Sequence, residues 1–233
     1  MTSILITGAS RGIGAAAHTA LKAAGCTVIG QSTTGGDGLI AADLAAQRAA
    51  DALWEQALAR ANGRIDVVVN NAGVFEAASI DDADGFATAW ARSLAINLQS
   101  AADLCRHAVL HFQQHGGGRI INVASRAGHR GDSPNHWHYA AAKGGMLAMT
   151  KSIARAYAAQ GILAFAITPG FTMTGMAEEY LASRGGDKLL ADIPLGRVAS
   201  PQEVAETIRW LATTAPASLT GATIDINGAS YVR

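Results

Sequence analysis

A tyrosine and a lysine four residues apart, Tyr139 and Lys143, are the residues of this chain best suited to move a proton. At that spacing two side chains lie on one face of a helix, one turn apart. A free tyrosine hydroxyl, with a pKa of about 10, is a poor acid and a worse base at neutral pH, but a nearby ammonium group lowers that pKa. Ser125, fourteen residues earlier, could hold a carbonyl or alcohol oxygen beside the phenol. The three residues predict proton transfer to or from a substrate oxygen, although tyrosine and lysine also share this spacing on ordinary surface helices.

A glycine-rich turn supplies a second kind of chemistry. Residues 7–14 read Thr-Gly-Ala-Ser-Arg-Gly-Ile-Gly and follow a short apolar run. Glycines let the backbone approach a phosphate closely, and a helix start offers unpaired N–H groups and the positive end of its dipole. The Gly-x₃-Gly-x-Gly spacing is neither the usual dinucleotide fingerprint nor a nucleoside-triphosphate loop. The turn predicts a pyrophosphate site; the alternative is a tight strand-to-helix turn that binds nothing.

These residues need a scaffold in which short apolar strands alternate with longer Ala/Leu-rich helices. We expect strands at 3–7, 27–31, 39–42, 67–70, 119–124, 162–167 and 223–226, and helices at 12–24, 45–61, 84–114, 138–160, 175–184 and 201–213. The alternation predicts an α/β fold, a single domain over residues 1–233 in which helices cover both faces of a doubly wound parallel sheet of about seven strands. Ligands of such sheets bind at the carboxyl ends of the strands.

One connection departs from that scheme. Only residues 32–38 separate the second and third predicted strands. A parallel crossover normally needs about a dozen residues, including its helix. We therefore predict a shortened connection, a loop where a helix would usually cover that edge of the sheet.

Composition excludes several classes of function. The chain has 233 residues, with 18 basic and 18 acidic side chains, so nothing indicates a nucleic-acid or membrane surface. Cys26 and Cys105 lack metal or disulfide spacing and are expected to be small buried thiols. The first residues indicate a strand, and no long apolar segment occurs, so we expect no signal peptide and no transmembrane helix. We expect a cytoplasmic protein.

Five motifs occur in an order that resembles the short-chain dehydrogenase/reductase family. They are the glycine turn, the Asn-Asn-Ala-Gly run at 70–73, Asn97, the Ser125/Tyr139/Lys143 set and the Pro-Gly pair at 169–170. The match runs from Ile4 to the segment at 225–228. Residues 193–197 and 201–204 look like the 3-oxoacyl-[acyl-carrier-protein] reductase branch.

The resemblance implies hydride transfer between a nicotinamide cofactor and a ketone or secondary alcohol, with Asn97, Ser125, Tyr139 and Lys143 as catalytic residues. Tyr139 would exchange the proton with the substrate oxygen, and Ser125 would hydrogen-bond the developing alkoxide. Lys143 would depress the pKa of the phenol and bind the ribose hydroxyls. Asn97 would help to hold a water linked to Lys143.

The resemblance also implies a cofactor site. Besides Tyr139 and Lys143, its expected residues are Gly8, Ser10, Arg11, Gly12, Ile13, Gly14, Ser32, Thr33, Asp43, Leu44, Asn71, Ala72, Gly73, Pro169, Gly170, Thr172 and Thr174. No acid that would repel a 2′-phosphate closes the second strand, and Arg11 lies in the glycine turn, so we expect NADP(H) to be favoured over NAD(H). Asp37 keeps NAD(H) open as the alternative.

The substrate side is less determined. Arg126, His136, Trp137, Phe171 and Met176 are candidate substrate contacts, and the segment 171–196 would form a lid. The Ser125–Tyr139 interval looks about one residue longer than is common in the family, so we expect a bulged loop; Ser133 would replace Ser125 if the register failed. His129, His136 and His138 have no carboxylate or cysteine at ligand spacing, so we expect no metal.

Two other functions stay open at this point. One is a dinucleotide-binding regulatory protein without turnover, which would have a damaged catalytic set. The other is a lyase resembling halohydrin dehalogenases, which would usually carry an arginine in place of Lys143. The helices at 84–114 and 138–160 resemble those that form dimer contacts in the family, so we expect a homotetramer or homodimer.

Overall fold

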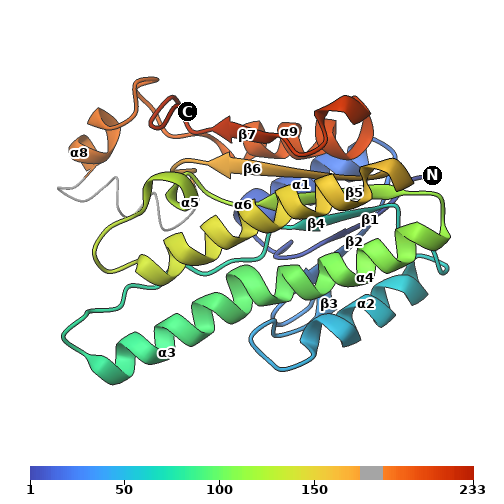
Figure 1. The fold of residues 1–233 in the computed structure, drawn as a ribbon, viewed down its shortest axis with the longest axis horizontal. Coiled ribbons are helices and arrows are strands. Elements are labelled where there is room, and N and C mark those ends of the chain that lie inside the picture. The colour runs from blue at the N-terminus through green and yellow to red at the C-terminus, as the bar shows by residue number, and fades with distance from the viewer. Residues whose placement is uncertain (174–185) are drawn as a thin grey trace.

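A parallel sheet forms the centre of the molecule. The computed structural model describes residues 1–173 and 186–233. Within them, seven strands make one parallel sheet in the order β3-β2-β1-β4-β5-β6-β7 (Figure 1). The strands are β1 (Ser3–Ile6), β2 (Thr27–Ser32), β3 (Ile40–Ala41), β4 (Val67–Asn70), β5 (Gly118–Val123), β6 (Ile162–Pro169) and β7 (Thr223–Ile226). The predicted seven-stranded, doubly wound sheet is confirmed.

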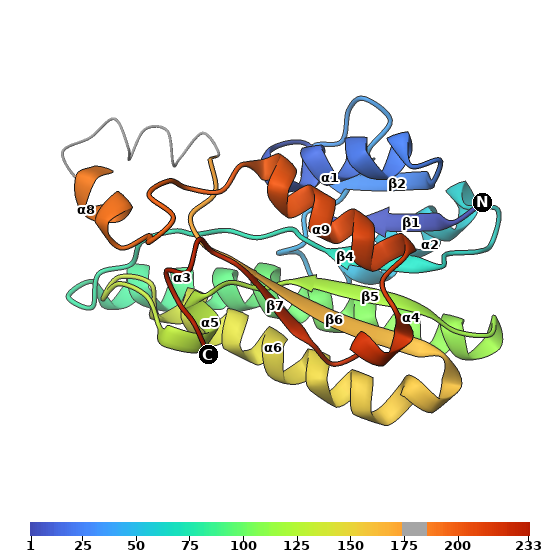
Figure 2. The same ribbon diagram turned by 90° about the horizontal axis from the view of Figure 1, so that it is seen from above.

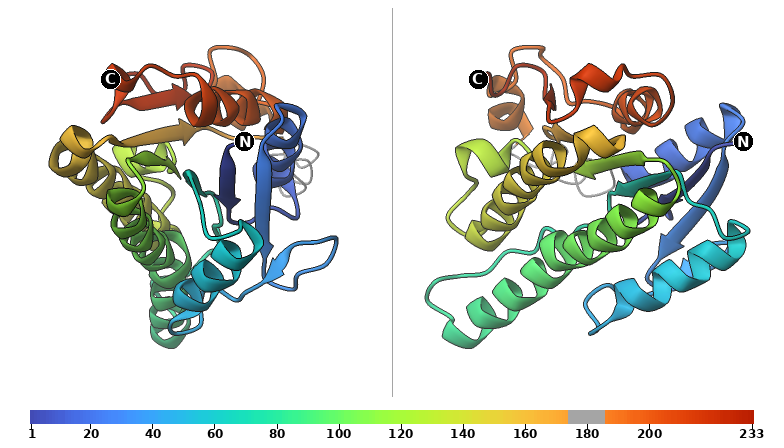
Figure 3. Two further views of the ribbon diagram at one scale, coloured as in Figure 1. Left: turned by 90° about the vertical axis from the view of Figure 1, so that its right-hand side faces the viewer. Right: turned by 45° about the vertical axis from the view of Figure 1, so that its right-hand side comes forward.

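Helices cover both faces of this sheet. They are α1 (Gly12–Ala23), α2 (Ala49–Arg60), α3 (Ala83–Leu94), α4 (Ser100–Gln114), α5 (Ala127–Arg130), α6 (Trp137–Tyr157), α8 (Gly186–Ala191) and α9 (Pro201–Thr213). Figure 2 shows α1 and α9 on one face, with α3, α4 and α6 on the other. Figure 3 shows α2 beside α4 on that second face.

Each face of the sheet has its own apolar core. Successive side chains of β1 and of β4 point to opposite faces of the sheet, as in any strand. Leu5 and Val68 join the core beneath α2, α4 and α6, whereas Ile4 and Val69 join the core beneath α1 and α9. All four side chains are fully buried, or nearly so. Burial on both faces explains why these strands are continuous apolar runs.

The order of strands reverses at β1. This strand pairs with β2 on one side and with β4 on the other, so the chain crosses the sheet between β3 and β4. A crevice forms at the carboxyl ends of the strands where such a reversal occurs, and ligands bind there. The glycine turn leaves β1 at this point.

The connection between β2 and β3 is the loop that the sequence predicts. Gly35, Gly36, Asp37 and Gly38 all have positive φ angles, which only a glycine-rich segment adopts readily. The Arg60 guanidinium of α2 donates to the Gly38 carbonyl and holds the loop against the domain. A helix is thus replaced by a tight, anchored loop.

Several helix boundaries differ from the sequence prediction. The long helix predicted at 84–114 contains a π-helical turn, Ala95–Gln99, between α3 and α4. The helix predicted from residue 45 begins only at Ala49, because Arg48 has a left-handed φ of 60°. A short helix, α5, forms in the loop between Ser125 and Tyr139. The helix predicted at 175–184 lies outside the described residues, as does part of the predicted lid.

The two cysteines differ in burial. Cys105 is buried, but Cys26 is only partly buried, so the expectation of two buried thiols is wrong for Cys26. Its position just before β2, at the rim of the sheet, explains the exposure.

In residues 1–173 and 186–233, no helix has the length and hydropathy that crossing a membrane requires.

Candidate active site

The glycine turn is held by the strands around it. Gly8 has a φ of 67°, and a Cβ there would lie 2.9 Å from the Ala72 Cα. A Cβ on Gly14 would lie 2.0 Å from the Gly8 carbonyl oxygen. The Asn71 amide donates to the carbonyls of Thr7 and Gly8, at 2.9 and 3.2 Å. This close packing requires glycine and fixes the turn at the end of β1.

The start of α1 fits an anionic group. Arg11 precedes the helix without a side-chain cap, and the first turn carries no acidic residue. Ser10 and Arg11 are exposed, and Gly12 and Ile13 are half-buried. Unpaired N–H groups at a helix start attract phosphate oxygens. The residues therefore fit the pyrophosphate of a dinucleotide.

A glutamine that the sequence analysis did not single out completes this turn. Gln31 is 2% exposed and lies near the end of β2. Its Oε1 accepts from the Gly8 N–H at 2.9 Å, and its Nε2 donates to the Ala42 carbonyl at 2.7 Å. No local signal in the sequence marks it, because β2 also carries Thr27 and Ser32.

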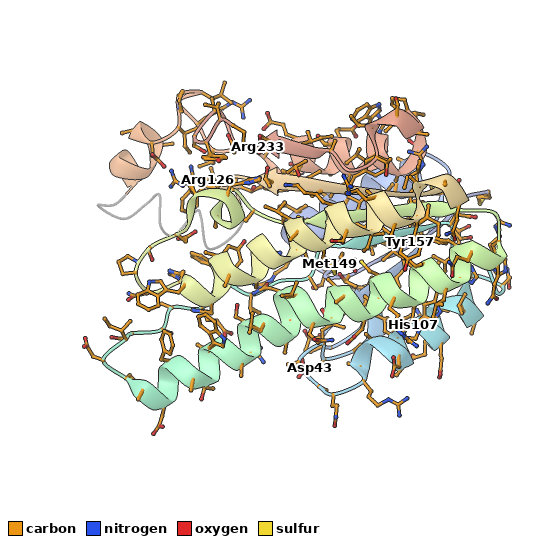
Figure 4. All side chains as sticks on the ribbon, in the orientation of Figure 1. Asp43, His107, Arg126, Met149, Tyr157 and Arg233 are labelled. Carbon is orange, nitrogen blue, oxygen red and sulfur yellow. The ribbon has the colours of Figure 1, made fainter. Side chains whose placement is uncertain are left out.

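The residues expected near the adenosine lie around β2 and β3. The Ser32 hydroxyl is engaged with the backbone of Gly35, as donor and acceptor. Thr33 is exposed. Asp43 follows β3, where its carboxylate accepts from the Ala45 N–H at 3.0 Å, and Leu44 beside it is buried. Figure 4 labels Asp43 at this edge of the sheet.

Asn97 lies in the π-helical turn and is fully buried. Its Oδ1 accepts from the Val74 N–H at 2.9 Å, and its Nδ2 donates to the Val74 carbonyl at 3.0 Å. A Cβ on Gly73 would lie 2.8 Å from this Oδ1 and 3.7 Å from the Lys143 Nζ. Asn97, Gly73 and Lys143 are therefore neighbours, as the resemblance implied. π-Helical turns occur frequently at functional sites.

Lys143 is buried in α6, with 3% of its surface exposed. Its Nζ donates to the Val123 carbonyl at the end of β5, at 2.8 Å. Burial lowers the pKa of Lys143 to about 8, because the charged form loses its hydration. The ammonium lies 5.8 Å from the centre of the Tyr139 ring.

Tyr139 and Ser125 form the pair that the sequence predicted. Ser125 faces the Tyr139 hydroxyl and favours the phenolate, but burial has the larger effect and raises the pKa of Tyr139. The depression of this pKa by Lys143 that we expected is therefore absent. The Ser125 hydroxyl itself accepts from the Ala127 N–H at 3.1 Å. Ser133, the alternative, instead hydrogen-bonds to the His136 ring at 2.7 Å. The register of the loop is kept because α5 takes up part of it.

The end of β6 forms the loop expected beside the nicotinamide. A Cβ on Gly170 would lie 3.0 Å from the Asn227 Cα, so the backbones approach closely here. The Thr172 hydroxyl donates to the Gly170 carbonyl at 3.4 Å, a long contact, and Thr172 pairs with Ala199 in an isolated bridge. Pro169 ends β6. Thr174 and Met176 lie outside the described residues.

Aromatic side chains surround the phenol. Phe75 packs edge-on against Tyr139 with ring centroids 4.9 Å apart, and stacks on His136 at 3.8 Å. Trp137 is exposed and touches Phe86, farther along the same side. The other two histidines point elsewhere: His129 stacks on Tyr231, and His138 bonds to the Glu76 carbonyl. Across the described parts of the chain, no group of three or more His, Cys, Asp or Glu residues could hold a metal ion.

Comparison with known proteins agrees with this geometry. Residues 8–229 match a family model described as enoyl-(acyl carrier protein) reductase. The chain is 37% identical to a 3-oxoacyl-[acyl-carrier-protein] reductase of Synechocystis, over 96% of this chain and 94% of the relative. It is 35% identical to the cis-4-hydroxycyclohexanecarboxylate dehydrogenase of Sinomonas cyclohexanicum, with the same coverage.

A solved structure is similar over almost the whole chain. It is the crystal structure of a protein assigned as an NAD(P)-dependent gluconate 5-dehydrogenase from Beutenbergia cavernae, with bound NADP at low occupancy. The TM-score is 0.87 at 30% identity, covering 97% of this chain and 95% of the other.

Proposed function

Since this chain belongs to the short-chain dehydrogenase/reductase family of NAD(P)-dependent oxidoreductases, we propose that Asn97, Ser125, Tyr139 and Lys143 are its catalytic residues. The observation that carries the proposal is the position of the Tyr139 hydroxyl next to Ser125 and beside the buried Lys143, whose ammonium lies 5.8 Å from the centre of the tyrosine ring. The bound cofactor supplies the hydride. The chain's own residues position the carbonyl group and deliver the proton.

The proton moves at the substrate oxygen. Burial raises the pKa of Tyr139, so the phenol carries its proton at neutral pH, as a proton donor must. It donates its proton to the carbonyl oxygen as negative charge develops there. Ser125 donates a second hydrogen bond to the same oxygen.

Lys143 and Asn97 support that transfer. The Lys143 ammonium binds the ribose hydroxyls of the cofactor and re-protonates the tyrosine through a water. Asn97 fixes Gly73 and Val74 beside this ammonium through its two hydrogen bonds to Val74. Because Lys143 is buried, little water screens its positive charge, and its electrostatic interactions with nearby groups are therefore strong.

We also propose that NADP(H) is preferred over NAD(H). Ser10 to Gly14 would hold the pyrophosphate, and Asn71, Ala72 and Gly73 would lie under the adenosine ribose. Arg11 is exposed beside the turn and is the candidate for the 2′-phosphate. Ser32 is a weaker candidate than its sequence position indicated, because its hydroxyl already bonds to Gly35.

The ratio of kcat/KM for NADPH to kcat/KM for NADH tests this preference. We expect NADPH to be favoured by at least about tenfold, the effect of one charge-assisted contact. Arg11→Gln should remove most of that ratio, whereas Arg209→Gln, in α9, should leave it unchanged. A preference for NADH above about tenfold would contradict the proposal.

The substrate is a ketone or secondary alcohol. The named relatives act on 3-oxoacyl thioesters and on a hydroxycyclohexanecarboxylate, so both classes belong in an NADPH-coupled screen. We further propose a homotetramer or homodimer built on α3, α4 and α6, as the resemblance implies.

A further inference from the structure

Arg126 follows Ser125 directly in the chain and is buried. Its side chain is 7% exposed, and its N–H donates to the Pro169 carbonyl at 3.2 Å. Figure 4 labels Arg126 beside α5, at the end of the molecule where α8 lies. A guanidinium cannot lose its charge at ordinary pH, so burying one here requires a negative partner.

The negative partner of Arg126 is shared and exposed. The Arg126 guanidinium contacts the Asp192 Oδ2 at 3.2 Å, and Arg130 contacts the same oxygen at 3.1 Å. The Asp192 side chain is 48% exposed and lies just after α8. Phe171 adds a ring 5.1 Å from the Arg126 guanidinium carbon. Two guanidinium groups thus bind one carboxylate oxygen that reaches in from the surface.

The two positive charges of Arg126 and Arg130 share the single negative charge of Asp192, so they are only partly neutralised by direct contact. Asp192 is the one carboxylate in direct contact with Arg126 among the described residues, while Asp132 acts on it only at longer range. Burial and the neighbouring Arg130 both lower the pKa of Arg126. The planar fork of a guanidinium accepts a carboxylate through two parallel bonds, and Asp192 uses only one oxygen here.

We propose that Arg126, with Arg130, binds a carboxylate group of the substrate in place of Asp192. The substrate class is then a ketone or secondary alcohol that carries a carboxylate within one small ring or short chain of the reacting carbon. This inference rests on the proposed function, because it requires the reacting carbon to lie at Ser125 and Tyr139. When no such substrate is bound, the Asp192 carboxylate contacts both guanidinium groups, and it would therefore compete with the substrate carboxylate for them.

Matched acids and esters test the substrate class. The probes are 4-oxocyclohexanecarboxylate and its methyl ester, 4-oxopentanoate and its methyl ester, and neutral 4-methylcyclohexanone, each with NADPH. We expect kcat/KM to be at least about tenfold higher for each acid than for its ester, mainly through a lower KM. Equal values for acids and esters would overturn this inference and leave the proposed function intact. NADPH binding without oxidation by any ketone would overturn both.

Two substitutions should move the acid-to-ester ratio in opposite directions. Arg126→Gln should lower it by about tenfold or more, whereas Asp192→Asn should raise it, because the competing carboxylate is gone. Arg209→Gln, which breaks an exposed ion pair in α9, should leave it unchanged. If Arg126→Gln fails to fold, Asp192→Asn still decides. A ratio that Asp192→Asn leaves unchanged or lowers would overturn the inference.

Discussion

At the scale of single residues, the site brings the Tyr139 phenol, the Ser125 hydroxyl and the buried Lys143 ammonium together near the end of β5. The residue types were readable from the sequence only together with the glycine turn, Asn71 and Asn97, since the tyrosine–lysine spacing by itself is common on surface helices. The protonation states of these residues were not readable from the sequence. Burial raises the pKa of Tyr139 and outweighs the opposing effect of Ser125, and burial follows from packing that no single motif shows.

Replacing Tyr139 with phenylalanine removes the acid and little else. We expect kcat for ketone reduction to fall by at least about a hundredfold, the low end for a positioned acid or base. NADPH affinity, measured by fluorescence titration, should stay within about threefold of the native value. Tyr157→Phe, near the far end of α6 (Figure 4), is the matched control and should keep full activity. Turnover near the native rate in Tyr139→Phe would mean that another group is the acid.

Lys143 should make NADPH binding depend on pH. Burial lowers its pKa from 10.5 to about 8, so its ammonium is present below about pH 8 and is lost above it. Because the ammonium favours the anionic cofactor and its ribose hydroxyls, we expect the Kd for NADPH to rise several-fold between pH 7 and about pH 9.5. Titrations across that range measure the effect. Lys143→Met should bind more weakly and lose this dependence; the same pH profile in the variant would assign it to another group.

At the scale of elements, the glycine turn places backbone N–H groups, and the π-helical turn places the Asn97 side chain. The turn was predictable, because glycines at residues 8, 12 and 14 between a strand and a helix have a known steric reason. The π-helical turn was not, since its residues continue an ordinary helical pattern. Gln31 was missed for a similar reason: its role comes from the approach of β1 and β3 to β2, which the sequence does not display.

Gly14→Ala tests the close packing of the turn. Its new Cβ would lie 2.0 Å from the Gly8 carbonyl oxygen and 2.5 Å from the Asn71 amide, so the turn must shift. We expect NADPH affinity to fall by at least about tenfold, because the N–H groups no longer face the pyrophosphate. Thermal unfolding should show a lower Tm as well.

Gly63→Ala is the control for this experiment. Gly63 also has a positive φ, but a Cβ there would meet nothing within 4 Å. This variant should lose about 1 kcal/mol of stability from backbone strain and keep its NADPH affinity. Equal NADPH affinity in the two variants would show that the turn does not hold the cofactor.

At the scale of the whole molecule, the layered α/β arrangement followed from the alternation of apolar runs and helical segments. The order of the strands agrees with the right-handed crossovers that such chains adopt. The capping box of α9, in which Ser200 and Glu203 exchange hydrogen bonds, likewise follows from residues three apart. The neighbours of Arg126 could not be predicted, since Asp192 is brought to it by the packing of segments far apart in the chain.

The short connection between β2 and β3 also bears on how the chain folds. β2 and β3 pair across a loop that begins after Ser32 and ends before Ile40, so closing it costs little chain entropy. By contrast, β1 pairs with β4 only when residues as distant as Ile4 and Val67 meet. Low sequence separation speeds the formation of contacts. The loop that replaces a helix therefore lets one edge of the sheet form from the first few dozen residues, ahead of the long-range pairing that builds the rest.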